Sequence, residues 1–87
     1  MSVLFVCGVF DSAVQSYGRP IFFRARGEGV RSFTDEVNRK DDNNALYGHP
    51  EDFELHLLAM FDEAKGTFAS VEVECLVRGK DASHDAP

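Results

Sequence analysis

The segment from Leu46 to Phe68 constrains the fold of this chain more than any other stretch of its sequence. Apolar residues recur at every second position from Phe53 to Phe61, which is the period of a half-buried β-strand. Pro50 cannot donate to a strand ladder and fits just before the strand, whereas Gly66 suits a hairpin turn after it. The alternation predicts a core face formed by Phe53, Leu55, Leu57, Ala59 and Phe61, with Glu54, His56, Leu58, Met60 and Asp62 on the other side.

The rest of the chain adds strands and one helix to this hairpin. Residues 3–10 are apolar on both alternating faces, which predicts a strand in the middle of a sheet, and residues 21–26 predict an antiparallel partner for it. Val30, Phe33 and Val37 recur at helical spacing and predict an amphipathic helix over about residues 29–40. Thr67 to Val77 continues the hairpin as one or two strands. The expected fold is α+β: a small antiparallel sheet of four to five strands with one helix packed on one face.

The length of 87 residues predicts a single domain over residues 1–79 and a flexible tail over residues 80–87, in which nothing is expected to be buried. Cys7 and Cys75 both fall in predicted strands, so we expect two buried, reduced thiols. No apolar run approaches the roughly 18 residues that a membrane span needs, so we expect no membrane partner.

The net charge of −6 is distributed unevenly between the two halves of the chain. Residues 1–40 carry six basic and four acidic side chains, whereas residues 41–87 carry three basic and eleven acidic ones. Cations that neutralise phosphates supply most of the affinity of sequence-blind nucleic-acid binding. The total charge therefore argues against tight binding of this kind, and only a local basic face could support it.

A basic and aromatic group between Tyr17 and Arg31 is such a face. Single-stranded nucleic acid is held by cations along its phosphates and by rings that stack on its bases. Strand alternation puts Phe22, Arg24 and Arg26 on one side, and these are the right chemistries at strand spacing. The alternative is that Phe22 is packed while the arginines pair with nearby acids. The candidate nucleic-acid-binding residues are Arg24, Arg26, Arg31, Arg19, Phe22 and Tyr17.

The sequence offers little for metal or catalytic chemistry. His49, His56 and His84 have no cysteine or carboxylate partners at a recognised zinc spacing. In the sequence, no nucleophile, general base and orienting residue have a spacing typical of a catalytic site. We therefore expect no metal, no cofactor and no enzymatic activity.

Several motifs follow one another in a fixed order along the chain: PIFF (residues 20–23), VRSFTDEVN (30–38), LYGHPEDFEL (46–55), FD (61–62) with Gly66, and LVRG (76–79). In these motifs, over roughly residues 10–80, the chain resembles the small nonstructural protein of the Microviridae, the single-stranded DNA bacteriophages, particularly those of the gokushovirus type. It differs from the family pattern in the glycines that flank the start of the helix and in Ala59, where glycine is usual.

The resemblance implies a nonstructural protein of the infected bacterium, located in the host cell cytoplasm and absent from the virion. Members are described as associated with DNA binding or with the production of single-stranded genomes, and no catalytic residues carry over. One expectation is weak binding of single-stranded DNA through the arginine and aromatic face. The alternative is an acidic interaction module that contacts phage replication or assembly proteins without touching DNA. A homodimer through an uncovered sheet edge, or through exposed Leu58 and Met60, is a third expectation.

Overall fold

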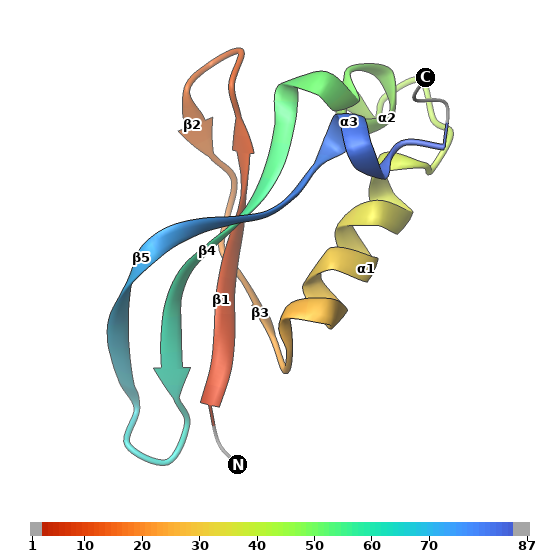
Figure 1. The fold of residues 1–87 in the computed structure, drawn as a ribbon. Coiled ribbons are helices and arrows are strands. Elements are labelled where there is room, and N and C mark those ends of the chain that lie inside the picture. The colour runs from red at the N-terminus through yellow and green to blue at the C-terminus, as the bar shows by residue number, and fades with distance from the viewer. Residues whose placement is uncertain (1–2, 85–87) are drawn as a thin grey trace.

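The computed structural model describes residues 3–84 and shows an antiparallel sheet with its helices gathered on one side (Figure 1). The predicted α+β class, with one long helix beside an antiparallel sheet, is confirmed. No helix of this part of the chain is long and apolar enough to cross a membrane. The strands are β1 (Val3–Asp11), β2 (Ser16–Tyr17), β3 (Ile21–Phe23), β4 (Phe53–Asp62) and β5 (Thr67–Arg78). The helices are α1 (Arg26–Val37), α2 (Ala45–Gly48), α3 (Gly79–Ala82) and the 3-10 turn η1 (Pro50–Asp52).

β1 lies inside the sheet, as its two apolar faces predict. It pairs with β4 along one edge, and with β2 and β3 along the other. β5 pairs with β4 and forms an outer edge of the sheet. The central ladder thus joins strands that are distant in the sequence, with Val3 opposite Asp62 and Asp11 opposite Phe53.

The core fills the space between α1 and the sheet face that α1 covers. Gly29 lies at this contact, because a Cβ placed there would be 3.0 Å from the ring of Phe23 and 3.5 Å from Leu55. The absence of a side chain on Gly29 lets the helix approach the sheet closely. The buried residues of the core cluster are Cys7, Phe23, Phe33, Val37, Phe53, Leu55, Leu57 and Ala82.

α1 begins at Arg26 and ends at Val37, rather than running from residue 29 to residue 40. Ala25 before it is extended, and the side chain of Glu28 accepts a hydrogen bond of 2.7 Å from the backbone N–H of Arg24. A carboxylate in the first turn also interacts favourably with the helix dipole. Arg26 is therefore part of the helix and does not follow the alternation expected of a strand.

A β-bulge at Leu58 overturns part of the predicted alternation in β4. Val6 is opposite Ala59 and Cys7 is opposite Leu57, so Leu58 has no partner in β1. An extra residue in one strand exchanges the faces of every residue that follows it. The prediction is correct for Phe53, Leu55 and Leu57, which are buried. It is wrong beyond the bulge, where Met60 packs against the core while Ala59 and Phe61 turn to the other face.

Two hairpin turns connect strands of the sheet. Gly66 has a φ of 67° in the turn between β4 and β5, as predicted, and Gln15 has a φ of 56° in the turn between β1 and β2. The β4–β5 turn sets Phe61 directly opposite Phe68. The turn therefore places two large aromatic rings side by side on neighbouring strands.

The segment after β5 packs against the end of α1. The Asn38 Nδ2 group donates to the backbone oxygens of Thr34 and Ala82, at 2.8 and 3.0 Å, and Asn38 Oδ1 accepts a bond of 2.8 Å from the backbone N–H of His84. Gly79 and Ala82 are buried. The expectation that nothing after residue 79 is buried is wrong, because the sequence does not reveal these hydrogen bonds. The tail prediction for residues 85–87 lies outside the described residues.

Candidate functional site

One face of the sheet points away from α1, and we call it the open face. The helices turn their apolar residues to the other face, where Leu46 of α2 and Ala82 of α3 join the core with α1. No helix of residues 3–84 covers the open face (Figure 1). It carries two groups of aromatic side chains, one at each end.

The first group is the phenylalanine triad, which consists of Phe22 of β3, Phe61 of β4 and Phe68 of β5. Its ring centroids are 5.6 Å apart for Phe22 and Phe61, 4.8 Å for Phe61 and Phe68, and 6.3 Å for Phe22 and Phe68. Phe22 is 44 % exposed and Phe68 is 62 % exposed, although each ring has an aromatic neighbour. Exposed aromatic rings gathered on one face are a common feature of binding surfaces.

A hollow of about 680 Å³ adjoins the triad and contains one of the predicted cations. Its lining includes Leu4, Phe22, Arg24 and the acids Glu28 and Glu63. Phe22 and Arg24 therefore lie together, as the alternation in the sequence predicts. Within residues 3–84, no ion pair engages the guanidinium of Arg24.

The second group is the ring cluster of Phe10, Tyr17 and His56. The Phe10 ring centroid lies 4.9 Å from that of Tyr17 and 5.4 Å from that of His56, and the rings of Phe10 and His56 are nearly parallel at 15°. The Tyr17 hydroxyl and His56 Nδ1 share a hydrogen bond of 2.7 Å. Hydrogen bonds at both ring nitrogens hold the histidine ring in one orientation.

The other predicted arginines do not join Phe22 in one patch. Arg26 lies on the covered side, with its guanidinium 5.3 Å above the ring of Phe5 and 3.1 Å from the carboxylate of Glu74. Arg31 is exposed on α1, half a turn away from the buried positions Gly29 and Phe33. Arg19 is exposed between β2 and β3. The single basic face expected from the sequence is absent, because α1 begins early and carries Arg26 and Arg31 away from Phe22.

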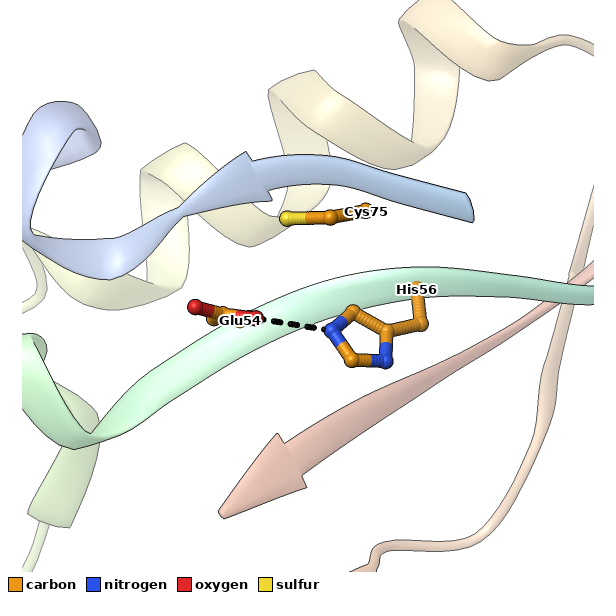
Figure 2. Close-up of side chains that lie close together, drawn as sticks. All are labelled: Glu54, His56 and Cys75. Atoms are coloured by element: carbon orange, nitrogen blue, oxygen red, sulfur yellow. Dashed lines mark hydrogen bonds and ion pairs between the residues drawn. The ribbon is translucent and has the colours of Figure 1, made fainter. Parts of the chain in front are cut away.

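A polar cluster lies beside the ring cluster and includes Glu54, His56 and Cys75 (Figure 2). His56 Nε2 is 2.8 Å from Glu54 Oε1, and the other oxygen of Glu54 is 3.7 Å from Nε of Arg78. The hydrogen bond with His56 lowers the pKa of Glu54. Burial raises the pKa of the Cys75 thiol, the charge of Glu54 raises it further, and Arg78 opposes both effects.

Several of these residues are missing from the set proposed on sequence grounds. Phe61 was assigned to the core, whereas Phe10 and Phe68 were not considered as binding residues. Phe61 and Phe68 lie just before and just after the predicted hairpin turn, and this placement could have indicated that the two residues pair. Cys75 was expected to be buried, but it is exposed, and only Cys7 is buried. Cys75 lies opposite His56 because of irregularities in the pairing of β4 and β5, and the sequence does not indicate these irregularities.

Together these features define a small α+β protein with one helix-covered sheet face and one open aromatic face. The sequence profile of the phage ORF5 protein family matches residues 4–82, and the chain belongs to this family. It is 34 % identical over 71 residues to Protein ORF5 of Chlamydia phage 1, an alignment that covers 79 % of this chain and 74 % of that protein. The resemblance to the microvirus protein is thereby confirmed. No solved structure gives a significant match to the chain.

Proposed function

We propose that this phage protein binds single-stranded DNA on its open face, without catalysis, in the cytoplasm of the infected cell. The observation that carries the proposal is the phenylalanine triad, because it offers the exposed rings of Phe22 and Phe68 on either side of the half-buried Phe61, on a face that no helix of residues 3–84 covers. A base stacked on an aromatic ring contributes about 1–3 kcal/mol, whatever its sequence. The viruses of this family have single-stranded DNA genomes, which supplies a ligand of the right kind.

Stacking, rather than charge, supplies most of the affinity in this proposal. Arg24 lies beside Phe22, and Lys65 is in the turn that joins the strands of Phe61 and Phe68. With about two phosphate contacts, the logarithm of the affinity should fall with the logarithm of the salt concentration at a slope no steeper than about −1.4. A basic surface would give a much steeper slope.

Replacing rings of the triad tests the proposal directly. We expect Phe22→Ala and Phe68→Ala each to weaken binding of a fluorescent single-stranded oligonucleotide by about 5- to 150-fold, because each loses a stacking surface worth about 1–3 kcal/mol. Both side chains are well exposed, so the variants should remain folded. Fluorescence anisotropy at low salt measures the affinity, and circular dichroism checks the fold.

Two arginine variants provide matched controls for this experiment. Arg24→Ala should weaken binding several-fold, whereas Arg26→Ala should leave it unchanged, because Arg26 lies on the covered side with Glu74. The proposal fails if the wild-type protein does not bind, or if the two phenylalanine variants bind as well as it does.

A second candidate function is the acidic interaction module, and the β5 edge favours it. β5 runs over 12 residues, pairs only with β4 and carries exposed Glu72 and Glu74. Such an edge can accept a strand from a partner protein or from a second copy of the chain. The protein can be purified from infected cells with its bound partners, with and without nuclease treatment. Phage replication or assembly proteins that remain bound after nuclease treatment would support this function. Recovery that nuclease abolishes would support DNA binding instead.

A further inference from the structure

Antiparallel pairing of β4 and β5 brings three metal-ligating side chains together. Glu54 and His56 are two residues apart on β4 and share a face, and Cys75 is directly opposite His56 on β5. A ligand atom from each of the three lies within 4.8 Å of the other two. Figure 2 shows the carboxylate, the imidazole and the sulfur converging from the two strands.

We propose that Glu54, His56 and Cys75 form a binding site for Zn²⁺. Zinc takes cysteine sulfur at about 2.3 Å, histidine nitrogen at about 2.0–2.1 Å and carboxylate oxygen at about 2.0–2.2 Å. The thiolate and the imidazole favour zinc over magnesium or calcium, which prefer sites made of oxygen ligands alone. Three protein ligands leave the fourth tetrahedral position to water or to a group from a partner.

The histidine is already held in a ligating orientation. Its side chain is only 13 % exposed, its ring is stacked on Phe10, and Nδ1 is bonded to the Tyr17 hydroxyl. Metal-bound histidines usually donate their second ring N–H to such a partner, which fixes the ring and its tautomer. Nε2 points toward Glu54 and donates its proton to that carboxylate. A metal ion would replace this proton, Nδ1–H would then donate to the Tyr17 hydroxyl, and the Cys75 thiol would also release its proton on binding.

Only a small rearrangement would admit the ion. Tetrahedral zinc separates its ligand atoms by roughly 3.3–3.6 Å. Glu54 Oε1 and His56 Nε2 are 2.8 Å apart and would have to separate slightly, whereas the full cluster spans at most 4.8 Å and would contract. Arg78 approaches the other oxygen of Glu54, so a metal ion bound by Oε1 would displace only the hydrogen bond with His56.

A second group of candidate ligands provides the comparison site. His49, Glu51 and Asp52 also lie within 4.8 Å of one another, but they contain no thiol. The side chains of His49 and Glu51 are 68 % and 60 % exposed, and their closest atoms are 3.9 Å apart. Nothing holds these side chains in one geometry, so a His49 variant serves as a control for metal binding at an exposed histidine.

Cobalt(II) tests the site because it replaces zinc and reports its ligands by absorbance. We expect the reduced protein to bind one Co²⁺ per chain, with thiolate-to-cobalt charge-transfer absorbance in the near ultraviolet, and Zn²⁺ to displace it. Cys75→Ser should abolish this absorbance, and Cys75 is exposed, so the variant should remain folded. His56→Gln and Glu54→Gln should each weaken Zn²⁺ binding at least tenfold, measured by competition with a chromophoric chelator.

Two further variants separate ligation at this site from general metal binding. Tyr17→Phe should weaken Zn²⁺ binding by about 10- to 100-fold while keeping the charge-transfer absorbance, because it removes only the partner of His56 Nδ1. His49→Gln should change nothing. The proposal is overturned if wild-type protein shows no charge-transfer absorbance, if that absorbance survives in Cys75→Ser, or if His49→Gln removes it. The outcome does not depend on whether the protein binds DNA.

Discussion

Replacing Gly79 with alanine should destabilise this protein by about 3 kcal/mol, a large share of the stability of a domain of this size. A Cβ on Gly79 would lie 2.1 Å from the backbone oxygen of Pro50 and 3.0 Å from that of Phe53. Neither atom belongs to a flexible side chain, so α3 would have to move away from η1. Urea unfolding followed by circular dichroism measures the loss.

Gly27→Ala is the matched control for this substitution. Gly27 is in the first turn of α1, and apart from its chain neighbours and the backbone of its own helix, no atom of residues 3–84 lies within 4 Å of the position of its Cβ. Alanine has the higher helix propensity, so this variant should be about 0.5 kcal/mol more stable than the wild type. If Gly79→Ala loses less than about 1 kcal/mol, then the tight contact between α3 and η1 is not important to the fold.

Replacing Asn44 with alanine should cost about 2–4 kcal/mol, because it removes three hydrogen bonds between a buried side chain and the backbone. Asn44 is 6 % exposed, and its Nδ2 donates to the backbone oxygens of Glu36 and Arg39 at 2.8 and 2.9 Å. Its Oδ1 accepts a bond of 3.2 Å from the backbone N–H of Leu46. One side chain thus closes the end of α1 and caps the start of α2. Thermal unfolding should show a fall in the melting temperature of roughly 10 °C or more.

The neighbouring asparagine is a control of the same residue type. Asn43 is exposed, so Asn43→Ala should change the free energy of unfolding by no more than about 0.5 kcal/mol. Asn44→Asp keeps an acceptor for Leu46 but loses both donors, and it should be destabilised as well. Equal stabilities for Asn43→Ala and Asn44→Ala would show that the buried hydrogen bonds contribute nothing.

Short-range pattern predicted the long strands and the helix α1, but not the short helices α2 and α3, nor all of the faces on which strand residues lie. The apolar period of β4 is visible in the sequence, and Phe53, Leu55 and Leu57 are buried as predicted. The bulge at Leu58 depends on how β1 pairs with β4, and no local residue marks it. Met60 and Phe61 therefore exchange places relative to the prediction. Without that exchange, Phe61 would not be part of the triad.

The site residues were harder to predict because they depend on register. The hairpin begins with Asp62 opposite Thr67, and a regular ladder continued from there would place Val73 opposite His56. Irregularities in β5 place Cys75 there instead. The predicted arginine face failed for a related reason, since the start of α1 at Arg26 removed that residue from the strand pattern. Phe22 and Arg24 come before the helix, and they lie together as predicted.

Because β1 lies inside the sheet, it can pair fully only after later strands have been synthesised. β1 is made first, but its long partner β4 ends only at Asp62. At ~5–20 residues per second, the apolar β1 waits roughly 3–12 s for that partner to emerge. Pairing between strands so distant in sequence is also slow in itself. The bonds from Asn38 to Ala82 and His84 must wait longer still, so the end of α1 closes only after β5 and α3 have been made.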